Sequence, residues 1–518
     1  MEEPIRFGDL AEARQRLSPA ELVFERRRRT LGLFLGPPAF LAVLFFPPSG
    51  LSPEAGRLAA IMAWVLIWWV TEAVPIPITA LMGPALAVVF GVFSAKEALA
   101  GFGDPVIFLF LGSFVLAEAM AFHGLDRRVA FALLGTRLFG GSGLRCMVGF
   151  ACLAAGLSMW LSNTATTAML YPIALGTVAA LRRPAEGEAP GAVEAARRRL
   201  AGPLLFACAY GASIGGVGTP VGTPPNLIAL GQLATLVDIH ISFVRWMTLA
   251  VPISAAMLAF ALVYLGFLLP AEMRGLRGGR EVVAAERRRL GPWTLGQKNV
   301  VVAFGLAVSL WVLPGIVGIV AGNESPSYRW LSRAFPESIV ALLAVCLLFV
   351  LPVDWKERRF TFSWTQAAHI DWGTLLLFGG GLALGGAMFK TGLAGAVGQT
   401  LTELTGASSA ASLTFVFTVS AIFLTEMTSN TATATMLVPL AIASAQAAGV
   451  DVLPPALGCT LGCSMAFMLP VATPPNAIIY GSGQVRITQM VRMGFFMVLA
   501  ASVIVPTAVL ALSHLVRL

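Results

Sequence analysis

The stretch FLTEMTSNTATATMLVPL, from Phe423 to Leu440, places six hydroxyl side chains, one Asn and one Glu inside an otherwise apolar segment. A close copy, GLSMWLSNTATTAMLYPI, runs from Gly156 to Ile173. Polar groups at this density do not face lipid; in membrane segments they face the protein interior or a wet cavity. The fold must therefore enclose two similar polar clusters within apolar surroundings.

The composition indicates an integral membrane protein. Of 518 residues, 57% are hydrophobic and 12% are charged, and the mean hydropathy is +0.81. Soluble domains contain about 25% charged residues. Roughly ten or eleven stretches have the ~20 apolar residues that a helical span needs, and no alternating pattern suggests a barrel. We therefore expect an all-α polytopic membrane protein with about eleven transmembrane helices.

The net charge of +8 comes from basic residues in short loops between the apolar stretches. This placement is typical of cytoplasmic loops, so we do not expect nucleic-acid binding. The first 30 residues are polar and basic and contain no signal-peptide core. We expect a cytoplasmic N-terminus and a multi-pass protein of the cell (inner) membrane.

Two uncharged runs are too long for one span and predict re-entrant hairpins. Cys146–Leu181 contains 36 residues without a charge. A straight helix of this length would extend ~54 Å, against a hydrocarbon core of ~30 Å. Because both flanks are basic, we expect a hairpin over residues 144–180 that enters from the cytoplasm. No Lys or Arg occurs between Lys390 and Arg486, so the second hairpin, over 409–448, is expected to enter from outside.

Each hairpin is followed by a span with a second polar break. The sequences are GGVGTPVGTPPN at Gly215–Asn226 and LPVATPPN at Leu469–Asn476. Tandem prolines remove backbone donors and interrupt a helix. We therefore expect broken helices over residues 201–232 and 453–482.

The motifs define an inverted repeat. The two SNT motifs lie 267 residues apart and the two TPPN motifs 250 residues apart, in the same order. The hairpins are expected to enter from opposite sides, and paired broken helices in inverted repeats are typical of secondary transporters with a site near the midplane. The expected segments are a basic cytoplasmic N-terminus (1–30), a first transmembrane helix (31–50), the first repeat (55–270), a basic cytoplasmic linker (271–298) and the second repeat (299–518).

The residues of the expected site indicate what it can bind. No Lys or Arg lies in the polar hairpin segments or in Leu200–Val237, and the acid near a tip is Glu426. Hydroxyl, amide and carbonyl oxygens bind hard cations, and helix N-termini bind carboxylates. A doubly charged anion in a site without arginine needs mobile positive charge. We hypothesise that bound sodium ions supply it, which would couple ion and anion binding.

The paired SNT hairpins, the TPPN breaks and WWVTEAVPIP (Trp68–Pro77) resemble the divalent anion:sodium symporter family, which carries dicarboxylates, citrate or sulfate. The resemblance spans roughly residues 55–515. It implies a transporter rather than an enzyme, with co-transported sodium and no organic cofactor. It also implies a homodimer in the bilayer, in which a scaffold holds the subunits while a transport domain moves like an elevator.

The resemblance also implies roles for individual residues. The first sodium site would use Ser158, Ser162 and Asn163 with backbone near Gly222, and the second would use Thr425, Ser429 and Asn430 with backbone near Ala472. The substrate would meet Asn163, Thr164, Asn430 and Thr431, and Thr223, Thr473 and Pro474 would close the pocket. Independently, Ser158 and Thr425 each precede the motif Ser by four residues, which places them on the same helix face. For Glu72 and Glu426 we expect capping or pairing roles.

Several alternatives remain at this point. We expect C4-dicarboxylates as substrate, because Thr223 and Thr473 leave slightly less room than serine or glycine would; citrate and sulfate are the alternatives. We expect import with sodium, because both halves contain a complete Ser/Thr-plus-Asn set; sodium-independent exchange is the alternative. The sequence GASIG (Gly211–Gly215) fits a hydrolase nucleophile pattern, but the four histidines lie outside the motif regions. A channel is disfavoured because both halves of the site lie in one chain. The cysteines are expected to be small buried residues, and 181–200 an exposed, flexible connector.

Overall fold

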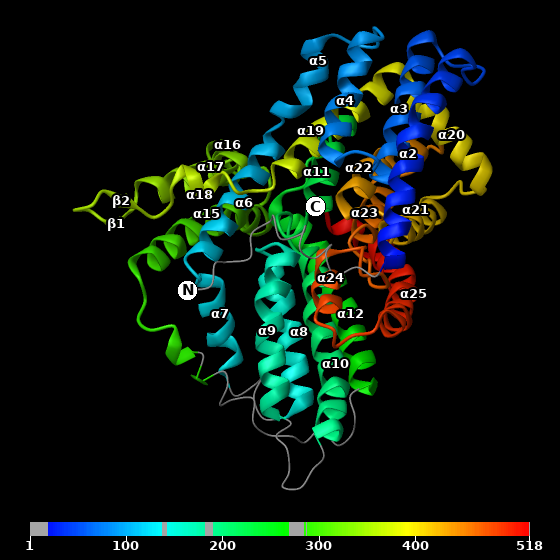
Figure 1. Cartoon of the computed structure of the whole chain (residues 1–518). Coiled ribbons are helices and arrows are strands. Elements are labelled where there is room, and N and C mark those ends of the chain that lie inside the picture. The colour runs from blue at the N-terminus through cyan, green and yellow to red at the C-terminus, as the bar shows by residue number, and fades with distance from the viewer. Residues whose placement is uncertain (1–18, 137–141, 182–189, 269–283, 286, 517–518) are drawn as a thin grey trace.

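The structure is a computed structural model of the chain that describes residues 19–136, 142–181, 190–268, 284–285 and 287–516. The described part is a bundle of helices with a single two-stranded hairpin that projects from one side (Figure 1). The expected all-α polytopic class is confirmed.

The helices follow the order of the expected segments. Before the linker they are α2 (Pro19–Phe45), α3 (Pro53–Thr71), α4 (Ile76–Val89), α5 (Ala95–Ala100), η2 (Gly101–Gly103), α6 (Pro105–Phe122), α7 (Leu125–Leu134), α8 (Gly143–Ser158), α9 (Asn163–Leu181), α10 (Pro190–Gly216), α11 (Pro224–Val237) and α12 (Phe243–Leu268).

After the linker they are α15 (Leu295–Ala321), α16 (Pro326–Ala334), α17 (Glu337–Val350), the strands β1 (Pro352–Asp354) and β2 (Arg359–Phe360), α18 (Trp364–Ala367), α19 (Trp372–Thr391), α20 (Leu393–Thr405), α21 (Ala410–Thr425), α22 (Asn430–Ala447), α23 (Leu453–Gly462), α24 (Pro474–Gly481), α25 (Ile487–Leu512) and η3 (Ser513–Val516). The strands pair antiparallel.

Six helices of the described part are long and apolar enough to cross a membrane, or up to eight if two bent pairs each count as one span. The pairs are α16–α17, bent by 53°, and α20–α21, bent by 93°. This number is below the eleven expected spans because hairpins and breaks divide the remaining apolar segments into shorter helices.

The two repeats place their turns at equivalent positions. Helix α6 ends before Gly124 and α19 ends before Gly392, and both glycines have a left-handed backbone, with φ of 64° and 79°. Glycine adopts this conformation without steric cost. The amphipathic helices α7 and α20 start directly afterwards. Each repeat therefore turns sharply before its hairpin, which is α8–α9 in the first repeat and α21–α22 in the second.

Some expected boundaries differ in the structure. Helix α10 already begins at Pro190, so the second half of the expected connector 181–200 is helical, while 182–189 lie outside the described residues. Helix α2 begins at Pro19 and continues the basic segment directly into the first apolar helix. Half of the linker 271–298, residues 271–283 and 286, also lies outside the described residues.

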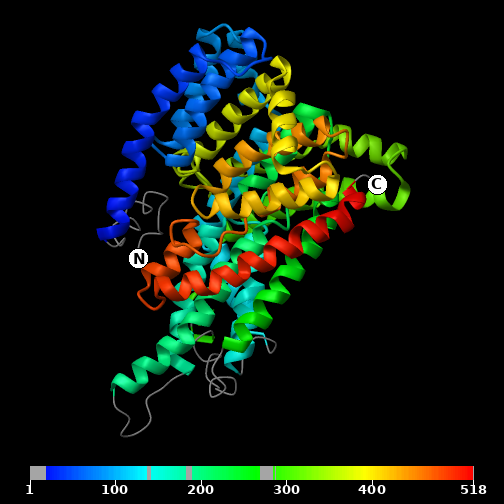
Figure 2. The same ribbon diagram turned by 90° about the vertical axis from the view of Figure 1, so that its right-hand side faces the viewer.

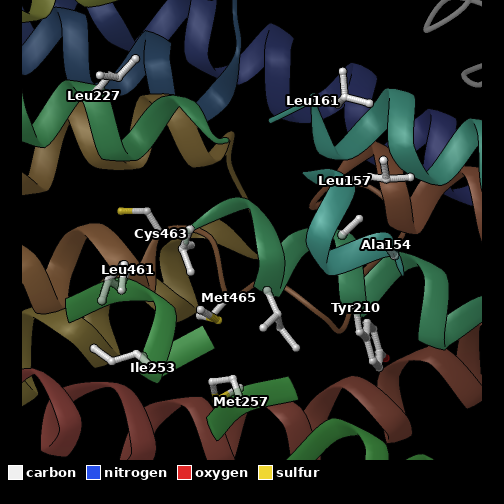
Figure 3. Packing of buried hydrophobic residues seen from close by; sticks show 14 of the residues in the cluster. Ala154, Leu157, Leu161, Tyr210, Leu227, Ile253, Met257, Leu461, Cys463 and Met465 are labelled. Atoms are coloured by element: carbon white, nitrogen blue, oxygen red, sulfur yellow. The ribbon is translucent and has the colours of Figure 1, made fainter. Parts of the chain in front are cut away.

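The core joins the repeats by an exchange of half-helices. Helix α11 of the first repeat packs against α22 and α23 of the second, and α24 of the second packs against α9 and α10 of the first. Figure 3 shows the apolar side chains at this junction, which are Ala154, Leu157, Leu161, Tyr210, Leu227, Ile253, Met257, Leu461, Cys463 and Met465. Helices α2, α3 and α4 form a second apolar cluster with parts of α19, α20 and α22 (Figure 2). Because of the exchange, each hairpin lies beside the break of the other repeat.

Close helix packing predicts which glycines tolerate a side chain. A methyl group on Gly380 would lie 2.1 Å from the carbonyl oxygen of Ala80 in α4, whereas Gly386 of the same helix faces open space. We expect Gly380→Ala to destabilise the protein by about 1–3 kcal/mol through overpacking. The control Gly386→Ala should leave stability unchanged or raise it slightly. Thermal unfolding of the purified protein in detergent measures both; equal melting temperatures for the two variants would contradict the packing.

Candidate functional site

The hairpin tips bring a hydroxyl and an amide together in both repeats. Ser158, at the end of α8, donates from Oγ to Oδ1 of Asn163, which begins α9, at 2.5 Å. In the second repeat Thr425 donates from Oγ1 to Oδ1 of Asn430 at 2.6 Å. Both hydroxyl residues are fully buried. Four of the expected sodium-site residues therefore form two matching contacts.

The N-termini of α9 and α22 also lie at these tips. The hydroxyl of Ser162 accepts from the N–H of Ala165 at 3.1 Å, as an N-cap does. Ser429 is the N-cap of α22 and has an extended backbone, but its side chain makes no capping bond. Unpaired N–H groups and the helix dipole make such ends suitable for binding carboxylates.

The two breaks are built from a Thr followed by two prolines. Thr223 and Thr473 are extended N-cap residues of α11 and α24, with φ of −149° and −142°. The prolines that follow occupy the first helical turn, where a missing N–H costs nothing. Thr473 Oγ1 accepts from the N–H of Asn476 at 3.3 Å, whereas Thr223 makes no capping bond with its side chain. The motif therefore starts a half-helix at the end of each break.

The Asn residues of the TPPN motifs hold the breaks together. The Nδ2 atom of Asn226 lies 2.7–3.3 Å from the carbonyl oxygens of Gly216, Val217 and Thr219. In the second repeat Asn476 Nδ2 donates to the carbonyls of Ala466 and Leu469, at 3.3 and 3.1 Å. Ala466 lies 250 residues after Gly216, and Leu469 lies 250 residues after Thr219. The two Asn side chains therefore bond equivalent carbonyls in the two repeats.

Carbonyl groups freed by a break must find donors in an apolar interior, and these amides supply them. The sequence alone gives neither Asn a role. Their position in the duplicated TPPN motif was the available signal. In the described part of the chain, the Oδ1 atoms of Asn226 and Asn476 are both buried without a hydrogen-bond partner.

Around the first tip, oxygen atoms converge on two glycines. A methyl group on Gly222 would lie 2.4 Å from the carbonyl oxygen of Gly216, 2.8 Å from that of Ser158 and 3.0 Å from that of Met159. A methyl group on Gly216 would lie 2.3 Å from Asn163 Oδ1 and 3.2 Å from the Gly222 carbonyl oxygen. These five oxygens are acceptors, and hard cations are bound by oxygens of this kind. The residues present therefore fit a cation here.

The second repeat has a related but different oxygen cluster. Ala466 and Ala472 stand where the first repeat has Gly216 and Gly222. Thr425 Oγ1 lies 2.6 Å from Asn430 Oδ1 and also 2.8 Å from the carbonyl oxygen of Cys463. A hydroxyl carries one proton and can donate to only one of these oxygens at a time. The oxygen lone pairs of Asn430 and Cys463 that receive no proton fit a cation. The sequence alone does not indicate the Cys463 carbonyl.

The buried carboxylate of Glu426 ties the second tip to the second break. It accepts from the N–H groups of Phe467, Met468 and Leu469 at 2.6–3.1 Å. At the equivalent position of the first repeat, the carbonyl of Met159 accepts from the hydroxyl of Thr219. Glu426 therefore has the capping role that we expected.

The expected site residues form two sets that the exchanged half-helices bring close together. Helix α24, which starts at Pro474 after Thr473, packs against α9, which carries Asn163 and Thr164. Helix α11, which starts after Thr223, packs against α22, which carries Asn430 and Thr431. The hydroxyl of Tyr210 also donates to the carbonyl of Phe467 at 3.3 Å and links the two breaks.

The other motifs give no competing site in the described residues. Ser213 of GASIG is 1% exposed inside α10 rather than at a strand-to-helix turn. The described residues contain no cluster of three His, Cys, Asp or Glu side chains that could hold a metal ion. Of the cysteines, Cys152 is half-buried and Cys346 is exposed on the apolar helix α17, so the expectation of uniform burial was wrong for these two.

Residues 28–516 match the family model of the sodium:sulfate symporter transmembrane region. The chain belongs to this family. The family consists of transporters, so the expectation that the chain is not an enzyme is confirmed. The protein is a multi-pass membrane protein.

Curated relatives cover almost the whole chain. The chain is 35% identical over 480 residues to the sodium-dependent dicarboxylate transporter SdcS of Staphylococcus saprophyticus, covering 92% of this chain and 89% of the relative. It is 34% identical over 479 residues to SdcS of Staphylococcus aureus, with the same coverage. The resemblance to the divalent anion:sodium symporter family is therefore confirmed.

The fold also resembles that of a solved transporter. The match to the YdaH transporter of Alcanivorax borkumensis, whose structure is described as having an unusual topology, has a TM-score of 0.53 at 13% identity. It covers 80% of this chain and 86% of the YdaH chain. At this identity the match supports the helical membrane fold alone.

The amide of Asn226 can be tested by a change that keeps its shape. Asn226→Asp removes both amide hydrogens and sets a carboxylate against three carbonyl oxygens, which should cost about 3 kcal/mol or more. Asn476→Asp should cost less, because its amide meets two carbonyls. Melting temperature in detergent is the measurement, with Gln399→Glu on an exposed face of α20 as the control. An unchanged melting temperature for Asn226→Asp would rule out this role.

Proposed function

We propose that this transporter imports C4-dicarboxylates together with sodium ions. The observation that carries the proposal is the pair of oxygen clusters at the hairpin tips, Ser158–Asn163 with Gly222 and Thr425–Asn430 with the Cys463 carbonyl. The names of the relatives, sodium-dependent dicarboxylate transporters at 34–35% identity, support the same substrate and ion.

The balance of charge supports sodium coupling. Neither the first hairpin after Arg145 nor the whole second hairpin contains a Lys or Arg, and neither does the stretch from Leu200 to Val237. A dicarboxylate held between the tips would meet hydroxyls, amides and the N-termini of α9 and α22, but no fixed cation from these segments. Sodium ions at the two clusters would balance its charge, so each ligand would strengthen the binding of the other.

We assign the residues accordingly. Sodium would be held by Ser158, Ser162, Asn163 and Gly222 in the first repeat and by Thr425, Ser429, Asn430 and Ala472 in the second. The substrate would contact Asn163, Thr164, Thr223, Asn430, Thr431, Thr473 and Pro474. The substrate carboxylates would lie at the N-termini of α9 and α22, which the hydroxyl–amide contacts position.

We further propose an elevator mechanism in a homodimer of the cell membrane with a cytoplasmic N-terminus. The hairpins and broken helices pack into one body through the exchange of α11 and α24, whereas α2, α3 and α4 form a second apolar cluster that meets this body at Met436 and Ala443 of α22. The first body would be the transport domain and the second part of the scaffold. The repeats would span 55–270 and 299–518.

Uptake of labelled succinate into proteoliposomes tests the function. We expect accumulation that requires an inward sodium gradient and saturates with succinate. Equal uptake with potassium in place of sodium, or exchange only against internal succinate, would overturn sodium symport. Competition by unlabelled citrate and sulfate decides between the substrate classes.

Substitution of the tip amides tests the site. Asn163→Ala and Asn430→Ala should each reduce sodium-driven uptake by at least about 100-fold, because each removes an oxygen that would face both ion and substrate. The control Thr400→Ala removes a hydroxyl that bonds within α20, and it should retain uptake. Full activity in both Asn variants, with wild-type melting temperatures, would count against the assignment.

A further inference from the structure

Arg28, in the basic segment of α2, contacts the tip of the second hairpin. Its Nη1 atom donates to the carbonyl oxygen of Met427 at 2.8 Å, across 399 residues of sequence. Its Nη2 atom lies 3.3 Å from Oε2 of Glu72. The guanidinium therefore links three segments: α2, the end of α3 and the α21–α22 tip.

Helices α2 and α3 pack closely at the base of this contact. Helices α2 and α3 approach so closely at Gly32 that a methyl group there would lie 1.8 Å from the hydroxyl of Thr71. Glu72 caps α3 with a left-handed backbone, φ 49°, and its carboxylate also pairs with Arg29 at 3.3 Å. Arg28 thus pairs with the Glu72 carboxylate on one side and bonds the hairpin on the other.

The contacted carbonyl lies inside the proposed site segment. Met427 follows Glu426 and precedes Ser429 and Asn430 by two and three residues. The contact uses the backbone, and the Met427 side chain itself is 57% exposed. Any displacement of the Met427 backbone would therefore also move the N-terminus of α22.

In the first hairpin, the residue equivalent to Met427 also contacts a helix outside the hairpin. Trp160 lies 267 residues before Met427. Its ring stacks on Phe243 at 5.9 Å between centroids, and Phe243 stacks on Trp311 of α15 at 5.3 Å. The same position of the repeat thus contacts neighbouring elements in both halves, by aromatic stacking in one and by a charged donor in the other.

The location of the contact identifies the state of the hairpin, if the proposed function and orientation hold. The basic end of α2 is expected on the cytoplasmic side, and the second hairpin is expected to enter from outside. A tip in contact with Arg28 is then displaced toward the cytoplasm. Movement of the transport domain outward would separate Met427 from α2.

We propose that Arg28 is a positioning residue that latches the second hairpin in an inward-facing state, and that each transport cycle breaks this latch. Arg28→Gln removes the charged donor and shifts the hairpin away from the inward-facing state. Arg29→Gln is the matched control, because Arg29 pairs with Glu72 and Glu25 but makes no contact with the hairpin in the described structure. Arg28→Lys keeps one charged donor and should give an intermediate result.

Thiol labelling measures the shift without any substrate. Met427→Cys is introduced with Cys346→Ser, since Cys346 is the exposed native cysteine. The protein is labelled with a membrane-impermeant maleimide in whole cells and in inside-out vesicles. We expect Arg28→Gln to change the ratio of the two labelling rates by about tenfold in favour of whole cells, as loss of a charged hydrogen bond would allow. A ratio equal to that of Arg29→Gln overturns the latch.

Sodium dependence provides the second measurement. In succinate uptake, Arg28→Gln should change the half-saturating sodium concentration by at least about threefold, because the latched tip carries Asn430. Arg29→Gln should leave it within about twofold. If the thiol introduced by Met427→Cys reacts from neither side, an unchanged sodium dependence in Arg28→Gln overturns the proposal. Absence of succinate uptake in the unmutated protein would instead overturn the proposed function, and the labelling ratio would still test the latch.

Discussion

Backbone that leaves helical form inside an apolar protein must have its polar groups satisfied by the protein itself. This requirement applies at the two hairpin tips and at the two TPPN breaks. At the breaks, the side-chain amides of Asn226 and Asn476 take up the freed carbonyls. At the second tip, the Glu426 carboxylate takes up three backbone N–H groups that the break leaves unpaired. The oxygens and N–H groups left over are those that a ligand could bind.

The two halves meet this requirement with different residues. The first repeat uses glycines at positions 216 and 222, so backbone oxygens approach closely, and its tip is joined to the break through the Thr219 hydroxyl. The second repeat has alanines at the matching positions and relies on Glu426 and the Cys463 carbonyl. The two repeats therefore share the same arrangement of tip and break, although several of the residues that form it differ. If the proposed sodium ions bind at these two oxygen clusters, the unequal construction of the clusters would give the two ions different affinities.

The exchange of α11 and α24 between the repeats joins the distant segments that carry the proposed site into one packed body. Each half-helix packs on the hairpin of the other repeat, so neither hairpin can move without carrying part of its counterpart. Contacts from this body to α2, α3 and α15 include an arginine on a carbonyl at one tip, a stack of rings at the other, and apolar packing of α22 against α3. Contacts of these kinds can break and re-form as a unit moves.

The sequence by itself determined the membrane class, the two hairpins, the two breaks and the family, because hydropathy, prolines and side-chain oxygens are visible in the order of residues. It also located Ser158 with Asn163 and Thr425 with Asn430, since each pair is local along the chain. Only the tertiary structure decided that the carbonyls of Gly216, Met159 and Cys463 join these clusters, that Asn226 and Asn476 hold the breaks, and that Arg28 reaches Met427. Every residue has the same backbone carbonyl, so the sequence cannot show which carbonyls take part in a site. A contact between residues 399 positions apart forms only when the helices have packed.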